Sequence, residues 1–345
     1  AYQSLRYIDN YIPRIPVIAK GWKEKGLYLY SETNWQPYTW SLNNVVTSEN
    51  LHTALAYWQG NRKEEAFKLW RSAMLETMYL SAGPGNFQQL SFYDAIRGEL
   101  YRDFADGVGM VSRSLVEGLF GINPDGLSNR LEIKPGFPEA WNNAGITTPD
   151  IRFDFTRDGD KDIYQIQQFN TARSVKLILP AFKDRVLNVK VNGKVIKWKQ
   201  VPDAVGQPLL ELVLPADDSL VVSLSWAGQK LERFYSEMEY HKGDRFSLQS
   251  VHLSGYKLYD PQRILEKSFT EKQIVGGWIA KNPGHYTLFV KATQGAFSWW
   301  HPVDVFVSPY PQPDHGQAVK MEGQKVVTDI NRFFNDKVTH IFKPQ

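Results

Sequence analysis

The chain has 345 residues, a length that is enough for two or three folded domains. Hydrophobic residues make up 42% of it, a larger fraction than a disordered chain contains. Its 40 basic and 37 acidic residues are interspersed, so we expect no nucleic-acid partner, and no apolar run approaches the ~20 residues of a membrane span. The sequence has no cysteine and its 7 histidines lack a metal-binding spacing, so we predict neither a metal site nor a cofactor.

Helical periodicity fills the first third of the chain. The predicted helices cover residues 2–10, 45–58, 63–80, 92–101 and 108–120. Gly60-Asn61 separates two of them as a tight helical hairpin. Gly121 fits the left-handed position that ends a helix, and Pro124 prevents the helix from continuing. A helical domain is therefore predicted over residues 1–121.

Strand periodicity replaces helical periodicity after the last predicted helix. Leu131 and Ile133 alternate with charged residues. The dipeptides Asp158-Gly159 and Asn192-Gly193 each separate two alternating runs, which is typical of β-hairpins. The predicted β domains are a β-sandwich over residues 122–227 and a second sandwich or immunoglobulin-like domain over residues 228–345.

The order of helices, turns and aromatic residues resembles a known enzyme group. The last predicted helix, GVGMVSRSLVEGLFGI, is followed by the strand RLEIKPGFP and then by Trp141. Upstream, SETNWQPYTWSLNNVVTSENLHTALAYWQGNRKEEAFKLW contains an alanine-rich helix that ends at a glycine. These segments resemble the end of the barrel in the (α/α)6-toroid glycosidases, which include α-L-rhamnosidases, α-L-fucosidases and cellobiose phosphorylases. The resemblance spans residues 32–226.

The resemblance implies a multidomain α-then-β chain, with helices of a partial (α/α)6 toroid followed by antiparallel β-sandwich domains. Six helical hairpins need far more helix than the sequence holds. We therefore expect a C-terminal portion, completed by the remainder of the same polypeptide or by a companion chain. The resemblance also implies a carbohydrate substrate and a periplasmic or extracellular location.

Acidic residues gather just before the last predicted helix, in SFYDAIRGELYRDFAD. The resemblance implies a general base in this segment, with the paired acid outside the chain, because glycoside hydrolysis uses two carboxyl groups across the scissile bond. We favour Glu99 and Asp94 as the base, with Asp103 and Asp106 as further candidates. Alternatively, the acids belong to a solvated charged helix, and Asp106 caps the last helix.

A second candidate site surrounds Glu32 in the run SETNWQPYTW. Trp35, Tyr38 and Trp40 are dense for a loop and are predicted to form a platform for sugar rings. Alternatively, Ser31 with Asn34, or Thr33 with Gln36, forms a capping box that opens a helix. Three further residues, from the neighbouring acidic and turn segments, complete the predicted substrate contacts: Asn86, Tyr93 and Arg97.

Three functions remain open at this point. The leading prediction is the C-terminal part of a glycoside hydrolase that acts on a complex polysaccharide or oligosaccharide by general acid/base catalysis. The alternatives are a polysaccharide lyase and a non-catalytic glycan-binding protein. Trp299 and Trp300, neighbours in a predicted strand, must face opposite sides, so one of them is expected at the surface or at an interface.

Overall fold

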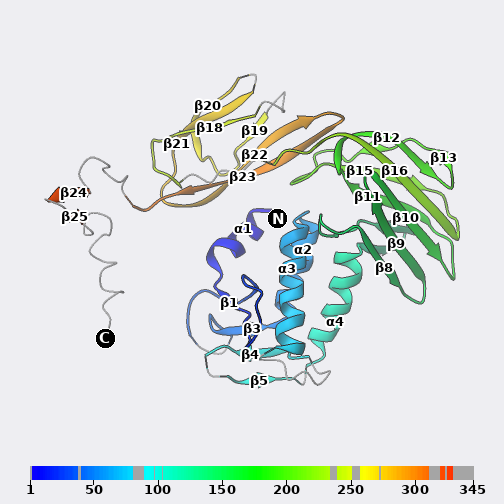
Figure 1. Cartoon of the computed structure of the whole chain (residues 1–345), viewed down its shortest axis with the longest axis horizontal. Helices are drawn as coiled ribbons and strands as arrows, with labels where there is room; N and C mark the ends of the chain where they lie inside the picture. The colour runs from blue at the N-terminus through cyan, green and yellow to red at the C-terminus, as the bar shows by residue number, and fades with distance from the viewer. Residues whose placement is uncertain are drawn as a thin grey trace. The chain divides into compact units, whose positions relative to one another are not determined.

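The structure, a computed structural model, divides the chain into two compact units (Figure 1). Unit 1 comprises residues 1–232 and 293–301, and unit 2 comprises residues 233–292 and 302–345. The described residues are 2–37, 40–80, 89–96, 98–102, 104–233, 239–250, 257–271, 273–310, 319–322 and 325–328.

The predicted fold class is wrong. Strands make up 45% of the chain and helices 19%, and the described residues form four short α-helices rather than the hairpins of a toroid. Part of a small sheet also lies where a helix was expected, because the strands β4 (Phe92–Asp94) and β5 (Leu100–Tyr101) fall within residues 92–101. The molecule is therefore a mainly β chain with a small helical part.

The helices of unit 1 lie close to their predicted positions. Their bounds are α1 Tyr2–Tyr11, α2 Thr47–Gln59, α3 Lys63–Met74 and α4 Asp106–Arg113. One turn of π-helix extends α3 over Leu75–Tyr79, and another extends α4 over Ser114–Leu119. Helices α2 and α3 pack as the predicted hairpin, which Asn61 closes in a left-handed conformation (φ 60°).

Trp58, on α2, fixes the joint between the helices and the first sandwich. Its indole nitrogen donates a hydrogen bond to the Gly136 carbonyl oxygen (2.9 Å). A methyl group added to Gly118 or to Gly136 would lie 2.2 Å or 2.3 Å from the Trp58 ring, so both positions need glycine. Gly121 has the predicted left-handed conformation (φ 68°) and lies directly against the Lys134 backbone.

Two small sheets flank the helices of unit 1. The first pairs β1 (Arg14–Pro16) with β2 (Tyr28–Tyr30). The second has the order β3-β4-β5, with bounds β3 Asn44–Val46, β4 Phe92–Asp94 and β5 Leu100–Tyr101. The helix predicted over residues 92–101 is therefore wrong, and a β-hairpin takes its place.

The rest of unit 1 is made of two β-sheets, which we call the first sandwich and which fit the β-sandwich expected after residue 121. Its six-stranded sheet has the order β13-β12-β16-β10-β9-β8 and its five-stranded sheet the order β14-β15-β11-β7-β6. The strand bounds are β6 Ile122–Asp125, β7 Arg130–Ile133, β8 Asn143–Thr147, β9 Ile151–Asp158, β10 Lys161–Gln168, β11 Ser174–Pro180, β12 Lys183–Val191, β13 Lys194–Val195, β14 Lys199–Gln200, β15 Leu209–Leu214 and β16 Ser219–Lys230. Both predicted hairpin turns are confirmed, at Gly159 and at Asn192-Gly193, where φ is positive.

A buried ion pair crosses the six-stranded sheet. The Asp162 carboxylate accepts two hydrogen bonds from Arg157 (2.6 and 2.8 Å) and one from the Trp226 indole nitrogen (2.9 Å). Bidentate geometry and a third donor compensate for the loss of hydration around the carboxylate. The group ties β9, β10 and β16 together.

Unit 2 contains two further sheets, with the orders β17-β23-β22-β19 and β18-β21-β20, and a separate pair, β24-β25. Its strand bounds are β17 Glu239–Tyr240, β18 Arg245–Gln249, β19 Lys257–Tyr259, β20 Leu265–Glu271, β21 Ile274–Ile279, β22 Gly284–Gln294, β23 Phe297–Val307, β24 Val319–Glu322 and β25 Lys325–Thr328. Alternate residues of β23 are buried, which gives this strand one face in a core.

The tip of the β22–β23 hairpin, residues 293–301, belongs to unit 1. Trp299 is buried there, whereas the Trp300 indole nitrogen donates a hydrogen bond to Asp203 (3.0 Å). The Trp300 amide also donates to the Ala204 carbonyl oxygen (2.8 Å). The two tryptophans therefore face opposite sides, as predicted, and Trp300 lies at an interface with a loop of the first sandwich.

Candidate active site: the Glu32 carboxyl group and the β3–β5 sheet

The loop that carries Glu32 is held against β3 by hydrogen bonds. The Glu32 amide donates to the Asn44 carbonyl oxygen (2.9 Å). Ser41 accepts a hydrogen bond from the Gln36 amide (3.0 Å), and its hydroxyl lies 3.2 Å from that of Thr33. Neither predicted capping box opens a helix, because the next helix, α2, begins only at residue 47. The loop therefore places Glu32 at the start of β3.

The Glu32 carboxyl group is half-buried and incompletely hydrogen-bonded. In the part of the chain that the structure describes, no group donates a hydrogen bond to its buried Oε2 atom. Burial raises the pKa of Glu32, and the negative charge of Glu49 raises it further. Glu49 is exposed in the first turn of α2, where the helix dipole favours a negative charge. Two carboxyl groups with different surroundings thus lie within electrostatic reach of each other.

A row of three aromatic rings lies on the same small sheet. Phe92 is buried, and its ring centroid lies 4.8 Å from that of Trp40 and 5.1 Å from that of Tyr101. Trp40 and Tyr101 remain 54% and 44% exposed. Trp40 also has a left-handed backbone (φ 59°), which is strained for a bulky side chain. The row therefore presents two rings, those of Trp40 and Tyr101, to solvent.

Asp94 holds the β4–β5 hairpin in shape. Its carboxylate accepts hydrogen bonds from the Asn43 side-chain amide (2.6 Å) and from the Ile96 backbone amide (2.9 Å), and it is 1% exposed. Side-chain alternation places Asp94 on the same face of β4 as Phe92. Glu99 is exposed, and its carbonyl oxygen accepts from the Asp94 amide. The two favoured acids therefore lie in one turn but in different surroundings.

Asp106 is the third described acid of the predicted cluster. It does not cap the last helix, because the residue at the N-cap position is Ala105 and no side chain there makes a capping hydrogen bond. Instead, Asp106 accepts a hydrogen bond from the Ser48 hydroxyl (2.7 Å), which joins α4 to α2. Four other predicted site residues lie outside the described residues: Tyr38, Asn86, Arg97 and Asp103.

The two remaining predicted substrate contacts differ in exposure. Trp35 is 62% exposed, in the same loop as Glu32. Tyr93 is buried on the face of β4 opposite Phe92, and burial together with the negative charge of Glu76 raises its pKa well above the usual range. Trp35 is therefore presented to solvent, whereas the Tyr93 ring is packed inside the protein.

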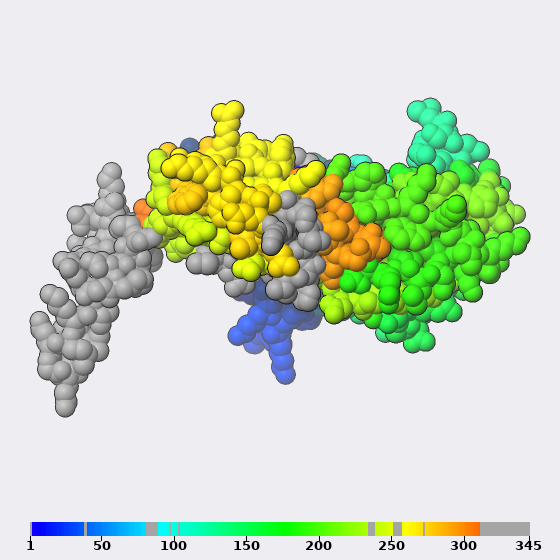
Figure 2. Space-filling view, turned by 90° about the horizontal axis from the view of Figure 1, so that it is seen from above, coloured from blue at the N-terminus to red at the C-terminus, as the bar shows by residue number. Residues whose placement is uncertain are grey.

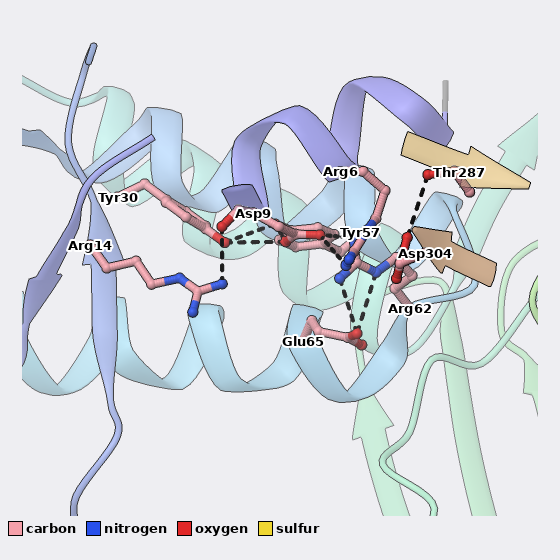
Figure 3. Close-up of polar contacts among 9 residues, drawn as sticks. All are labelled: Arg6, Asp9, Arg14, Tyr30, Tyr57, Arg62, Glu65, Thr287 and Asp304. Atoms are coloured by element: carbon pink, nitrogen blue, oxygen red, sulfur yellow. Dashed lines mark hydrogen bonds and ion pairs between the residues drawn. The ribbon is translucent and has the colours of Figure 1, made fainter. Parts of the chain in front are cut away.

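Sequence reasoning missed a buried network around Asp9 (Figure 3). The Tyr57 hydroxyl donates to Asp9 Oδ1 (2.6 Å), and Arg62 and Arg6 both bind Oδ2 (2.7 and 2.8 Å). Burial raises the pKa of Asp9, but the hydrogen bonds and positive charge of Arg62, with help from Tyr57 and Arg6, hold it below its usual value. Arg62 also contacts Glu65 (3.0 Å). Both oxygens of the Asp9 carboxylate therefore accept hydrogen bonds, and these bonds join α1 to the α2–α3 hairpin.

Among the described residues, no three His, Asp or Glu side chains are grouped to hold a metal ion. None of the helices that the structure describes is long and apolar enough to cross a membrane.

No protein-family model matches the chain, and no curated protein sequence matches it. Among solved structures, a crystal structure of the titin domains Z1Z2 in complex with telethonin has 15% identity, covers 47% of this chain and 98% of the titin chain, and has a TM-score of 0.17. A chimeric titin Z1Z2 that carries a peptide from decorin has 13% identity, covers 47% and 99%, and has a TM-score of 0.16. These TM-scores are too low to support a conclusion about fold or function.

Proposed function

We propose that the chain acts on a glycan, and that Glu32 is the proton donor in the hydrolysis of a glycosidic bond. A general acid must keep its proton near neutral pH, which an ordinary glutamate does not. Burial and Glu49 both raise the pKa of Glu32, and its buried Oε2 has no hydrogen-bond partner among the described residues. This combination is the observation that carries the proposal.

Glu49 supplies the second carboxyl group in the proposed reaction. Glu32 protonates the glycosidic oxygen as the bond to the anomeric carbon breaks, and ionised Glu49 takes a proton from the water that attacks that carbon. Pairs of carboxyl groups with different environments divide acid and base roles in this way. Asp94, Glu99 and Asp106 remain alternative bases, and in the proposal Asp94 positions the hairpin that carries the aromatic row.

The aromatic residues provide the proposed substrate contacts. Trp40 and Tyr101 are exposed rings that pack against Phe92 of β4, and Trp35 is an exposed residue three positions after Glu32 in the chain. Flat rings of this kind stack on the apolar faces of sugars. The Trp40 backbone is strained, which supports a role for this side chain beyond packing. We propose a periplasmic or extracellular glycan as the substrate.

The lyase alternative has less support. A lyase needs a base that removes a proton beside a uronate carboxylate, and tyrosine often takes that role. Tyr93 is buried and has a raised pKa, which disfavours the phenolate. His52 is exposed on α2, whereas Tyr93 is buried on β4.

The test is the release of reducing ends from a panel of polysaccharides and oligosaccharides, with the Glu32→Gln variant beside the wild type. We expect loss of about 10²- to 10⁴-fold in rate, the usual contribution of a general acid. Glu132→Gln is the matched control, because Glu132 is also half-buried but lies on β7 of the sandwich. It should retain the wild-type rate.

Two results would contradict the proposed function. Equal rates for the wild type and Glu32→Gln would remove Glu32 from the reaction, and the same assay on Asp94→Asn, Glu99→Gln and Asp106→Asn would then test the alternative acids. Binding of a glycan that depends on Trp40, without turnover by the wild type, would instead favour the non-catalytic glycan-binding alternative.

A further inference from the structure

The three-stranded sheet of unit 2 has one buried and one exposed face. On β18, Phe246 is buried, whereas Arg245 and Ser247 are exposed. On β21, Val275 and Ile279 are buried. This alternation means that the sheet packs its inner face into a core and presents the other face outward. Strands β20 and β21 form part of the surface shown in Figure 2, where they are yellow.

A tryptophan occupies the centre of the exposed face. Trp278 lies on β21, the middle strand, and pairs with Arg245 on one side and with Glu266 on the other. It is 37% exposed, although tryptophan is highly buried on average. The Trp278 ring therefore lies between the Arg245 guanidinium, which can donate several hydrogen bonds, and the Glu266 carboxylate, which can accept them.

A β-bulge brings a second ring to the same face. On β20, Glu266 pairs with Trp278 and Phe269 pairs with Gly276, so three residues of β20 oppose two of β21. In a regular strand, a spacing of three residues from Glu266 would turn Phe269 to the inner face. The bulge instead places Phe269 beside Trp278, with ring centroids 6.3 Å apart and ring planes at 62°.

Gly276, on the exposed face of β21, leaves room for the Phe269 ring. A methyl group added to Gly276 would lie 2.8 Å from the Phe269 ring, so the ring lies directly over the glycine. The Arg245 guanidinium lies 5.5 Å from the centre of the same ring. Phe269, Trp278 and Arg245 thus form one continuous contact surface, which we call the Trp278 face.

We propose that the Trp278 face is a second, non-catalytic binding site for a single neutral glycan chain. Ring faces match the apolar sides of sugar rings, and the flanking guanidinium and carboxylate match hydroxyl groups as donor and acceptor. The opposite charges of Arg245 and Glu266 disfavour a uniformly anionic ligand. The angle of 62° between the rings fits one twisted chain rather than a flat crystalline surface. The choice of a glycan rests in part on the proposed function.

The test is affinity gel electrophoresis of the full chain in gels that contain a soluble polysaccharide. Xylan, galactomannan and hydroxyethylcellulose are the neutral probes, and polygalacturonate is the anionic one. We expect retardation by at least one neutral probe, weakened about tenfold by Trp278→Ala and less by Phe269→Ala. Trp278→Tyr, which keeps a ring, should retain most of the binding. Thermal melting of each variant checks that the sheet still folds.

Trp22→Ala is the matched control, because Trp22 is 38% exposed but belongs to unit 1, and this variant should bind as the wild type does. Glu32→Gln should also bind normally, which separates failure of this site from failure of the proposed catalytic site. Unchanged retardation of folded Trp278→Ala would overturn the inference. Absence of retardation by every neutral probe, or retardation by polygalacturonate alone, would overturn it as well.

Discussion

At the scale of single residues, the half-buried carboxyl group of Glu32 and the buried one of Asp9 affect stability in opposite ways as the pH changes. The pKa of Glu32 is raised in the folded protein and the pKa of Asp9 is lowered. A raised carboxyl pKa means that the folded state binds the proton more tightly than the unfolded state, so stability falls as the pH rises through the folded pKa. A lowered pKa gives the reverse dependence.

Glu32→Gln should therefore make the protein more stable at neutral pH, even as it removes the proposed activity. The amide removes the half-buried negative charge and its repulsion by Glu49. Urea unfolding at pH 7 and at pH 4 is the measurement. The gain should be present at pH 7 and should shrink toward pH 4, below the ordinary value of 4.5. A loss of stability at pH 7 would contradict this environment for Glu32.

Asp9→Asn should destabilise the protein by about 3–5 kcal/mol at pH 7, because Arg62 then loses a buried partner. The stability from Asp9 is present above its unfolded pKa and is lost as the pH falls through the lower folded pKa, so the difference between the proteins should narrow in acid. Denaturant unfolding measures both effects. Glu24→Gln, at an exposed pair with Arg71, should change the stability far less than Asp9→Asn does.

Sequence alone predicted Glu32 as a candidate but not Asp9. A glutamate among tryptophans and tyrosines in a loop is a local pattern, visible within ten residues. The partners of Asp9 include Tyr57 and Arg62, about fifty residues away, and only Arg6 lies within one helical turn of it. Glu49 was also missed, because an acid in the first turn of a helix is ordinary.

At the scale of elements, the joint around Trp58 gives a direct test of packing. Gly118→Ala should destabilise the protein by about 1–3 kcal/mol, because the new methyl group would overlap the Trp58 ring. Gly109→Ala is the matched control in the preceding helix, where a methyl group meets no atom within 4 Å. It should stabilise by about 0.5–1 kcal/mol. Similar effects for both variants, measured by denaturant unfolding, would contradict this packing.

Most elements were predictable because each has a local period, and the main error has an identifiable cause. The segment 92–101 was predicted as a helix from its apolar and charged spacing. Gly98, with a left-handed backbone (φ 73°), instead closes a turn in which its amide donates to the Asp94 carbonyl oxygen. Pairing of β4 with β3, whose residues Asn44–Val46 lie far earlier in the chain, then stabilises the strand, and no local pattern contains that partner.

At the scale of the whole molecule, segments far apart in sequence complete unit 1. Phe297, from the tip of the β22–β23 hairpin, is buried and packs against Trp198 with ring centroids 5.4 Å apart. Phe297→Ala should therefore destabilise the protein by about 3–5 kcal/mol. Tyr310→Ala, at an exposed ring, should stay within about 0.5 kcal/mol of the wild type. Equal stability of the two variants would contradict the packing of the tip.

The predicted fold class was wrong because it was inferred from the resemblance of local segments, which does not determine how a whole molecule is arranged. Four predicted helices lie where expected, and the two predicted hairpin turns are confirmed. Helices of that length are common to many architectures, so their presence did not specify a toroid. The small β1–β2 and β3–β5 sheets, which distinguish this unit, arise from pairings between short and distant segments.

The central claim is that burial and the charge of Glu49 raise the pKa of Glu32 above that of an ordinary glutamate. Titration of Glu32 by carbon-detected NMR, in the wild type and in Glu49→Gln, measures this directly and needs no knowledge of the substrate. We expect a pKa above 4.5 in the wild type and a lower value once the charge of Glu49 is removed. A wild-type pKa at or below 4.5 would contradict the account.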